Sequence, residues 1–193
     1  MSVLDRIIDA DRSAFLVING AHSATADTLM WYVSDLRVWL PLYVLFLVVI
    51  KLRWGWRGLF WSVPVIAGMI LLSDSGSVML FKNTVQRLRP CHAFELQGMV
   101  HLVNNYCGGD YGFVSAHASN HFAIATFMAG IFQRKPWWLV LALLLWASLI
   151  GYSRIYLGVH YPGDVIVGAI YGAIVGMLAF SIFMVIHQRN SAT

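Results

Sequence analysis

Long apolar runs separated by charged residues dominate this sequence and limit the folds open to it. A membrane interior about 30 Å thick is crossed by roughly 20 mostly apolar residues in a helix. Five runs approach that length, the shorter ones with the help of flanking residues, and they cover residues 37–52, 58–81, 115–133, 137–153 and 165–187. The sequence therefore predicts an all-α, polytopic membrane bundle of about five transmembrane helices.

The overall composition agrees with a membrane protein. Of the 193 residues, 59% are hydrophobic and 11% are charged, and the mean hydropathy of +0.69 lies outside the usual range of soluble domains. No Pro/Ser-rich, repetitive or low-complexity segment divides the chain, so residues 1–193 are expected to form one domain. The net charge of +4 does not indicate nucleic-acid binding, because the basic residues are dispersed among apolar segments.

Residues 1–36 differ from the rest of the chain because apolar residues at helical spacing alternate there with charged ones. Such a pattern is typical of helices that lie in the membrane interface, so we expect interfacial helices in 1–36 and a transmembrane core in 37–187. The acidic residues Asp5, Asp9 and Asp11 are unlike the positively charged start of a secretory signal. No cleaved signal peptide is expected.

Basic residues at the ends of the apolar runs predict the orientation. One set lies at the ends that the positive-inside rule places in the cytoplasm: Lys51, Arg53, Arg57, Arg134, Lys135 and Arg189. The N-terminal segment and the loops of about 82–114 and 153–164 would then lie outside, on the periplasmic face of a bacterial inner membrane. Four cations on that outer side oppose the rule: Lys82, Arg87, Arg89 and Arg154. A function is the natural explanation for them.

Three short segments on the outer side concentrate polar residues that a membrane protein otherwise avoids. The first covers residues 82–90. If the preceding helix continues through it, Lys82 and Arg89 are seven residues apart and share one helical face, and Pro90 then ends the helix. The segment therefore predicts a pair of neighbouring cations at a helix end.

The other two segments carry histidines near helix N-termini. Ser115, Ala116 and His117 open the third apolar run, where the hydroxyl and the free backbone N–H groups of a helix start form an anion site. In the third segment His160 is followed four residues later by Asp164. This carboxylate could accept a hydrogen bond from the imidazole and fix its tautomer.

Together these residues suit phosphoryl transfer. The three equatorial oxygens of the transferred group carry negative charge, which preorganised cations and N–H donors must match. The candidate donors are Lys82, Arg89, Arg154, Ser115 and the amide of Ala116. A route without metal also needs a nucleophile and an acid for the leaving oxygen, and two histidines, one of them beside an aspartate, meet that need.

The three segments resemble, in order and in separation, the signatures of the type 2 phosphatidic acid phosphatase superfamily of lipid phosphate phosphatases: Lys82-x6-Arg89-Pro90, Ser115-x-His117 and Ser153-Arg154-x5-His160-x3-Asp164. The resemblance covers about residues 74–170, and the N-terminal stretch is similar to the amphipathic lead-in of small bacterial members. It implies a core related to the vanadium haloperoxidases and a lipid phosphatase without a cofactor.

Residue roles follow from the same resemblance. It makes His160 the nucleophile that forms a phosphohistidine, Asp164 the partner of His160, and His117 the acid that protonates the leaving group. The phosphate-binding side chains are then those of Lys82, Arg89, Ser115 and Arg154.

Two positions depart from the family pattern, and neither removes a catalytic side chain. Val114 stands where the family usually has proline, and Ala116 where it usually has glycine. If that glycine has a positive φ, alanine would be strained by about 1 kcal/mol.

Two alternatives compete with this interpretation. His117 with His121, and His160 with Asp164, are i, i+4 pairs that could hold a divalent metal. The positive charges of Lys82, Arg89 and Arg154 would repel a metal ion but suit an anion, so no metal is expected. A non-enzymatic binder or transporter of anionic lipid headgroups would use the cations alone, and would have no need of an acid and a supported nucleophile.

A site at the outer membrane face lets a lipid keep its tails in the bilayer while its phosphate enters from the side. The candidate substrates are undecaprenyl diphosphate, phosphatidylglycerol phosphate, phosphatidic acid and lipid A phosphates. The sequence does not choose among these lipids, and it sets no oligomeric state.

The outer loop contains both cysteines of the chain. Cys91 and Cys107 are 16 residues apart, and an oxidising compartment would allow them to form a disulfide. Two reduced thiols are the alternative. His92 and His101 of the same loop are expected to be solvated.

Overall fold

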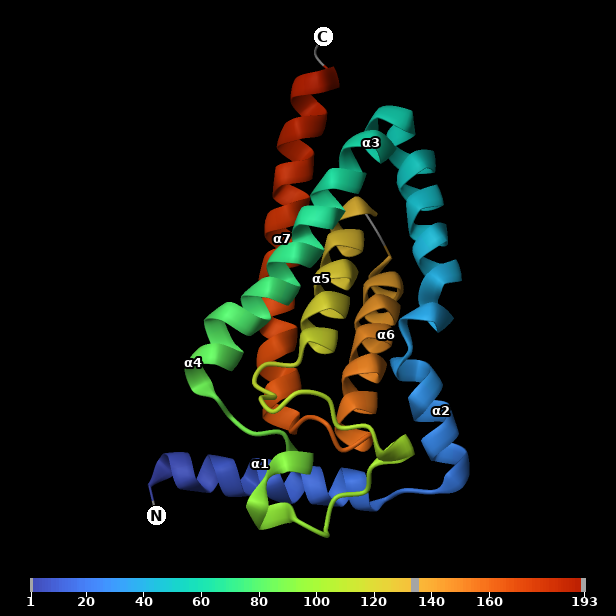
Figure 1. Cartoon of the computed structure of the whole chain (residues 1–193). Coiled ribbons are helices and arrows are strands. Elements are labelled where there is room, and N and C mark those ends of the chain that lie inside the picture. The colour runs from blue at the N-terminus through green and yellow to red at the C-terminus, as the bar shows by residue number, and fades with distance from the viewer. Residues whose placement is uncertain (1, 133–135, 192–193) are drawn as a thin grey trace.

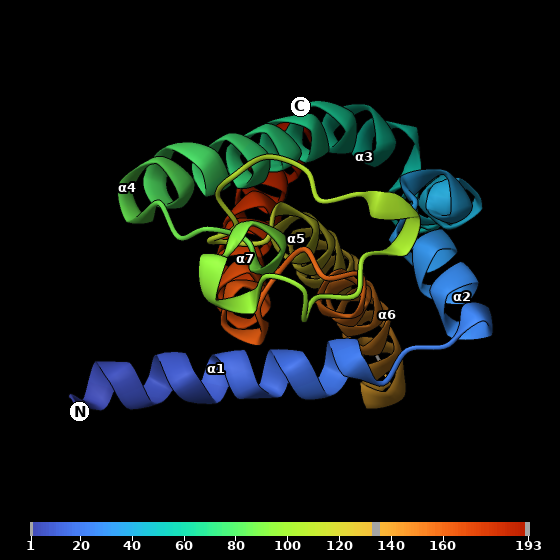
Figure 2. The same ribbon diagram turned by 60° about the horizontal axis from the view of Figure 1, so that its bottom comes forward.

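The computed structural model describes residues 2–132 and 136–191, which form a bundle of long helices with one helix lying across its end (Figures 1 and 2). Apart from an isolated bridge between Leu88 and Tyr111, the described residues form helices, turns and loops. Within these residues, three stretches are long and apolar enough to cross a membrane: Leu36–Val85, Trp137–Tyr156 and Pro162–Arg189. The predicted all-α bundle is confirmed.

Two helices occupy the N-terminal segment. α1 (Val3–Gly20) begins with a capping box in which Ser2 and Asp5 satisfy each other's backbone N–H groups. It lies across the end of the bundle (Figure 2). α2 (Ala24–Ser34) begins at the N-cap Ser23, packs on α6 and leads through the short 3-10 helix η1 (Leu36–Trp39) into the bundle.

The first two predicted spans are the two arms of one helix, α3 (Leu40–Gly76). Gly55, with φ of 69°, reverses the chain between the arms, a conformation that glycine adopts without strain. Figure 1 shows the arms meeting in a sharp turn at the end of the bundle farthest from α1. The second arm continues through the π-helical turn η2 (Ser77–Lys82) and the short α4 (Asn83–Val85).

The helix does not continue to Pro90, so the prediction that Lys82 and Arg89 share one helical face is wrong. It ends at Val85, because Gln86 adopts a left-handed conformation with φ of 50°. Lys82 therefore remains on the helical turn, whereas Arg89 belongs to the extended segment that follows.

Backbone hydrogen bonds to a distant part of the loop replace those of the expected helix. The amide of Arg89 donates to the carbonyl of Asp110 at 3.0 Å, and the amide of Gly112 donates to the carbonyl of Arg87 at 2.9 Å. Residues i and i+2 of an extended segment face the same side. The pairing thus directs both arginine side chains toward the bundle.

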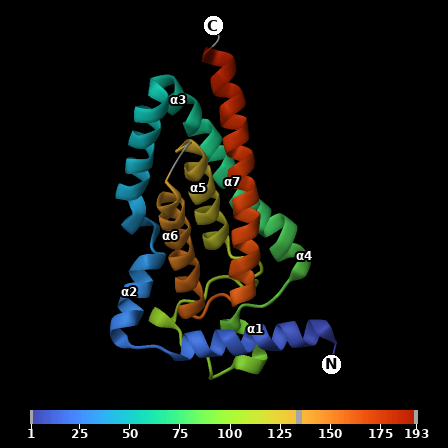
Figure 3. The ribbon, with the colours of Figure 1, turned by 180° about the vertical axis from the view of Figure 1, so that it is seen from behind.

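Three further helices complete the bundle: α5 (Ala116–Ile131), α6 (Trp137–Tyr156) and α7 (Pro162–Ser191). α5 has 16 residues and lies at the centre, in contact with α3, α6 and α7. Figure 3 shows α7 running the length of the bundle. Gly168, Gly172 and Gly176 of α7 face α5, where an added Cβ at each would collide with its backbone carbonyls. This stripe of glycines lets the two helices pack closely.

The reversal of α3, the end of α5, the start of α6 and the end of α7 all lie away from α1 (Figures 1 and 3). The basic residues expected to face the cytoplasm belong to this end where they are described: Lys51, Arg53, Arg57 and Arg189. Arg134 and Lys135 lie outside the described residues. The polar segments of the sequence gather at the opposite end, beside α1.

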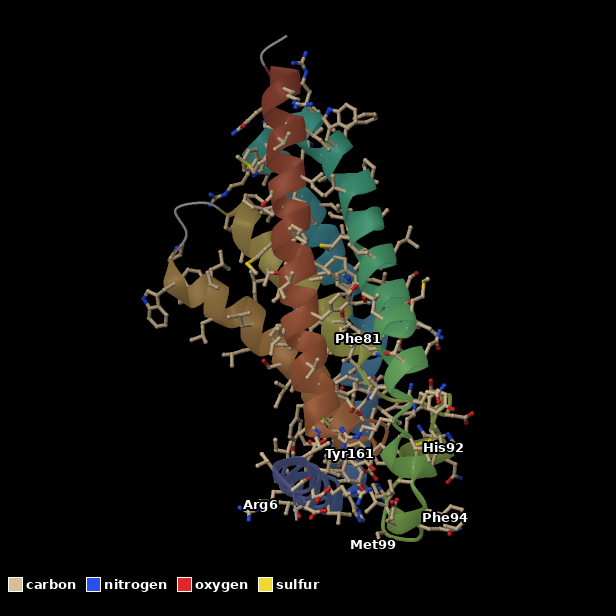
Figure 4. The ribbon with its side chains drawn as sticks, turned by 90° about the vertical axis from the view of Figure 1, so that its left-hand side faces the viewer. Arg6, Phe81, His92, Phe94, Met99 and Tyr161 are labelled. Atoms are coloured by element: carbon tan, nitrogen blue, oxygen red, sulfur yellow. A yellow bond between two sulfur atoms is a disulfide. The ribbon has the colours of Figure 1, made fainter. Side chains whose placement is uncertain are left out.

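The outer loop contains three short 3-10 helices, η3 (Pro90–His92), η4 (Phe94–Leu96) and η5 (Val103–Asn105). Figure 4 places Phe94 and Met99 at its outermost edge. His101 is not simply solvated as expected: its ring stacks on His22 with centroids 3.7 Å apart, and its Nε2 lies 3.0 Å from Asp27 Oδ2. His92, by contrast, is exposed.

Cys91 and Cys107 form a disulfide, with their Cα atoms 6.0 Å apart. The bridge closes a loop of 16 residues, for which the chain-entropy model gives a stabilisation of about 3 kcal/mol. The double variant Cys91→Ser/Cys107→Ser is therefore expected to unfold at a lower temperature in detergent than the wild type. Equal unfolding temperatures for the two proteins, or two thiols that react with alkylating agent before reduction, would contradict this prediction.

Candidate active site

The first and third polar segments meet at His160, which lies in the turn between α6 and α7 and is buried. Arg89 reaches this turn from the extended segment. Its Nη1 lies 3.0 Å from His160 Nε2 and donates to the carbonyl of Val159 at 3.0 Å, and its Nε donates to the carbonyl of Gly109 at 2.6 Å. A guanidinium is thereby fixed against one nitrogen of a buried imidazole.

The second segment is joined to the third through the backbone. The amide of Ser115 donates to the carbonyl of Asp164 at 3.0 Å. Ser115 is the N-cap of α5, and its Oγ accepts from the amide of Ala118 at 3.4 Å. Because Oγ acts as an acceptor there, its own proton is available to a ligand.

The contacts of His160 set its tautomer. A guanidinium only donates hydrogen bonds, so Nε2, which faces Arg89, must be the unprotonated nitrogen, and Nδ1 must carry the proton. Asp164 Oδ2 lies 3.4 Å from Nδ1, a long contact, and also accepts from the amide of Tyr161 at 2.9 Å. Among the described residues Nδ1 has no hydrogen bond of ordinary length. A small movement of this fully buried carboxylate would complete one.

Burial also determines the charge of His160. Removal from water lowers the pKa of His160 to about 4; Asp164 opposes this shift, and the positive charges of Arg89 and Arg154 add to it. Burial likewise lowers the pKa of Arg89, but a guanidinium stays charged at neutral pH. The site therefore holds a neutral imidazole, with its lone pair exposed on Nε2, beside a fixed positive charge.

His117 occupies the first turn of α5, within electrostatic range of Arg154, His160 and Arg89. It lines a cavity of about 350 Å³ together with Arg154 and Tyr106. Arg154 is buried; its Nη1 donates to the hydroxyl of Ser34, but within the described part of the chain its Nε has no partner. A buried donor of this kind is costly unless water or a ligand accepts from it.

Lys82 lies within electrostatic range of Arg89 and Asp164, so the structure brings all the candidate residues to one region. In residues 2–132 and 136–191, Lys82, Arg89 and Arg154 form no ion pair within 4.0 Å. Asp164, the carboxylate that lies 3.4 Å from His160 Nδ1, is paired with Arg87 instead. Three cations without a carboxylate partner are destabilising in a buried region, so the site is suited to an anion.

A second cavity, of about 520 Å³, lies between the two arms of α3 and α5. Its walls are mainly apolar, and they include Phe46, Leu47, Met69, Ile70, Ile124 and Phe127. It shares Ser34, Leu36 and His117 with the smaller cavity. An apolar space thus ends at the candidate acid, next to the cations, as a molecule with an apolar tail and an anionic head requires.

The metal site considered for His117 and His121 is not formed by these rings. His121 Nδ1 donates to the carbonyl of His117 at 2.7 Å, and its Nε2 therefore accepts from the hydroxyl of Tyr43 at 2.9 Å. Both ring nitrogens of His121 are engaged. The described residues bring three ligand atoms within 4.8 Å of one another at Cys91, His92 and Cys107, but there the two sulfurs are bonded to each other.

Two residues near the candidate nucleophile His160 were not predicted from the sequence. Arg87 Nη1 pairs with Asp164 Oδ1 at 2.9 Å, and Arg87 Nη2 pairs with Asp11 Oδ2 at 2.7 Å. Arg87 stood out only as one of four outer cations. Its position two residues before Arg89 becomes a signal once the segment is known to be extended. Asp11 gave no local signal, because α1 reaches the site only through the tertiary fold.

The condition for strain at Ala116, a positive φ, is not met. Ala116 is the first residue of α5, and the described non-glycine residues with positive φ are Gln86, Asn104 and Asn105. The alanine therefore keeps its amide at the helix N-terminus without a conformational cost.

Comparisons with known proteins agree with this geometry. A model of the PAP2 superfamily matches residues 61–188. The chain is 34% identical over 181 residues to a lipid A 4'-phosphatase of Bacteroides thetaiotaomicron, covering 93% of this chain and 80% of that protein. It is 30% identical over 190 residues to a lipid A 4'-phosphatase of Porphyromonas gingivalis, with coverages of 96% and 78%. The crystal structure of Aquifex aeolicus LpxE has a TM-score of 0.62 and 25% identity, and the match covers 88% of this chain and 93% of that one.

Proposed function

The chain belongs to the PAP2 superfamily and is a membrane lipid phosphatase, and we propose that it removes the 4'-phosphate of lipid A at the periplasmic face of a bacterial inner membrane. One observation carries the chemistry: three cations that have no carboxylate partner among the described residues share one region with the buried His160 and the partly buried His117, at the end of an apolar cavity. The similarity to two lipid A 4'-phosphatases along more than nine-tenths of the chain favours this substrate over the other lipid phosphates.

Binding of the phosphate follows from the charges. The lipid chains enter the apolar cavity between the arms of α3 and α5, and the phosphate meets Lys82, Arg89 and Arg154. The hydroxyl of Ser115 and the amide of Ala116 at the start of α5 supply further donors. These groups match the charge on the equatorial oxygens as the transition state forms.

In the proposed first step, the lone pair on His160 Nε2 attacks phosphorus, and the bond from phosphorus to the lipid oxygen breaks in line with it. His117 protonates the departing oxygen, which leaves as the lipid alcohol. Asp164 holds the proton on Nδ1 and stabilises the positive charge that the imidazole acquires. In the second step His117 takes a proton from water, and the resulting hydroxide displaces His160 and releases phosphate.

The pKa of His160 predicts how activity depends on pH. The attack needs the neutral imidazole, and the folded-state pKa of about 4 is lower than the ordinary value of about 6.5. The nucleophile therefore stays neutral as the pH falls past 6.5, and kcat/KM should decrease with the protonation of His160 only near pH 4. A profile of kcat/KM against pH checks this expectation; loss of activity with an apparent pKa near the ordinary value would contradict it.

The substrate is tested by release of inorganic phosphate in detergent from lipid A, undecaprenyl diphosphate, phosphatidylglycerol phosphate and phosphatidic acid, each with and without a chelator. We expect the highest kcat/KM with lipid A, a product that mass spectrometry shows to lack the 4'-phosphate, no effect of the chelator, and inhibition by vanadate. A higher kcat/KM with another lipid would reassign the substrate. Tight binding without turnover would favour the headgroup binder, and complete loss on chelation would overturn the metal-free mechanism.

A further inference from the structure

The side chain of Arg87 bridges two carboxylates from opposite ends of the sequence. One arm of its guanidinium pairs with Asp164 Oδ1 at 2.9 Å, and the other pairs with Asp11 Oδ2 at 2.7 Å. Asp164 belongs to the first turn of α7, whereas Asp11 belongs to α1. A continuous line of ionic contacts therefore runs from the N-terminal helix to the partner of His160.

These ion pairs are largely, though not completely, shielded from water. The side chains of Asp11, Arg87 and Asp164 are 12%, 22% and 0% exposed. Exposed ion pairs are screened and contribute little, but removing one member of a buried pair leaves a charge without compensation. The geometry of this network is therefore held firmly in the folded protein.

Arg87 leaves Asp164 little freedom to turn. It holds Oδ1, while Oδ2 accepts from the amide of Tyr161 and faces His160 Nδ1. Arg87 is itself held on two sides, because its guanidinium lies 3.8 Å from the ring centroid of Tyr161 and its second arm is taken by Asp11. The carboxylate can thus approach Nδ1 without rotating away from it.

Asp11 also holds the backbone next to Asp164. Its Oδ1 accepts from the amide of Gly163 at 2.7 Å, and a Cβ on that glycine would lie 2.9 Å from Asp11 Oδ2. The same helix packs Phe15 edge-on against the ring of Tyr161, with centroids 5.4 Å apart. In Figure 4, viewed nearly along α1, Tyr161 lies at the end of the bundle beside this helix.

From these contacts we infer that Asp11 and Arg87 are positioning residues for the phosphatase reaction: through them, α1 holds Asp164 in line with the nucleophile His160. This inference rests on the proposed function, because it requires His160 to accept the phosphoryl group. Both residues act through Asp164, since Arg87 pairs with that carboxylate and Asp11 pairs with Arg87. Their effect is on the alignment of the imidazole, and so on the rate of the chemical step.

The first test compares Asp11→Asn with Asp9→Asn, the same chemical change on an exposed residue of the same helix. Misalignment of a nucleophile affects chemistry more than binding, so Asp11→Asn should lower kcat about 10- to 100-fold with KM within about twofold of the wild type. Asp9→Asn should retain wild-type kcat, and Asp11→Glu should recover part of the loss. Equal kcat values for Asp11→Asn and Asp9→Asn would overturn the inference.

The variant Asn19→Ala distinguishes two roles of α1: positioning Asp164 through Asp11 and Arg87, or only stabilising the folded protein. Asn19 is buried and anchors the other end of α1 through hydrogen bonds to His101 and Tyr156, away from Arg87. Its loss should lower the unfolding temperature at least as much as Asp11→Asn does, while kcat stays near the wild-type value. If Asn19→Ala lowered kcat as much as Asp11→Asn, α1 would be only a structural support.

The dependence of kcat/KM on pH provides a further test, because residues with only a structural role would not change its acidic limb. The charged and titratable groups facing His160 are Asp164 of α7, Arg89 of the extended segment, Arg154 of α6 and His117 of α5. Loss of the negative charge in Asp11→Asn should shift the acidic limb of kcat/KM to lower pH, and loss of the positive charge in Arg87→Gln should shift it to higher pH. Shifts in the same direction, or none, would contradict the proposed coupling.

A double variant tests whether the two residues act as one unit. If Asp11 acts through Arg87, then Asp11→Asn/Arg87→Gln should have the same kcat as Arg87→Gln alone. If the decreases in kcat of the two single variants were additive in the double variant, Asp11 would not act through Arg87. Failure of the proposed function would give a different result. In that case neither the wild type nor Asp9→Asn would release phosphate from any lipid tested, and this inference would also lose its basis.

Discussion

Replacing His160 with alanine is expected to abolish phosphate release, with a decrease in kcat of at least about 10⁴-fold, the scale on which nucleophile variants of other hydrolases fail. The reason is geometric as well as chemical. His160 Nε2 carries the available lone pair next to Arg89, and no water could occupy that position with the same nucleophilicity and alignment.

The matched control for this variant is His92→Ala, which removes an exposed imidazole from the outer loop. Both proteins should unfold at similar temperatures in detergent, and only His160→Ala should lose activity. Initial rates of phosphate release from lipid A decide the outcome. A His160→Ala variant within about tenfold of the wild type would mean that another group attacks phosphorus.

The second large effect is expected for His117→Asn, with a decrease in kcat of about 10²- to 10⁴-fold for a lipid substrate. An alkoxide leaves poorly unless it is protonated, and His117 is the imidazole placed at the junction of the two cavities. An aryl phosphate that the enzyme accepts has a leaving group that needs no proton, so its first step should be nearly as fast in the variant as in the wild type.

This difference in leaving groups would make the proposed phosphohistidine observable. In the proposed mechanism, hydrolysis of the intermediate also needs His117, as the base, so His117→Asn treated with an aryl phosphate should accumulate an acid-labile, alkali-stable phosphoenzyme. His160→Ala treated in the same way should show none. Equal losses of rate with lipid and aryl substrates, without a trapped intermediate, would contradict the role of His117 as the acid.

The sequence was sufficient for those parts of the structure that depend on local pattern. Apolar runs of membrane length predicted the two arms of α3 and the helices α5, α6 and α7. The predicted run from residue 115 also placed Ser115 at the start of α5, where it is the N-cap, whereas α7 begins three residues before the predicted run and includes Asp164 in its first turn. The family motifs then named the residues that converge on one region, although they lie on three segments that are separate in the sequence.

What the sequence did not predict depends on contacts between distant segments. The end of the helix at Val85 reflects a left-handed Gln86 and hydrogen bonds to residues 110–112, and neither has a signature in residues 82–90. The same holds for Arg87, whose partners Asp11 and Asp164 are separated from it by more than seventy residues on either side. Local propensity favours a continued helix there, and tertiary pairing overrides it.

The close packing of α5 against α7 has a consequence for how such an enzyme can diversify. His117 and Asp164 lie on two helices whose separation is fixed by glycines and by the Ser115 to Asp164 backbone hydrogen bond, with no loop between them to set it. The apolar arms of α3, and the parts of the outer loop beyond Arg89, can therefore accumulate changes that suit a new lipid while the spacing between His117 and Asp164 is inherited intact. Much of the surface available for lipid recognition is thus structurally separate from the two helices that carry these residues.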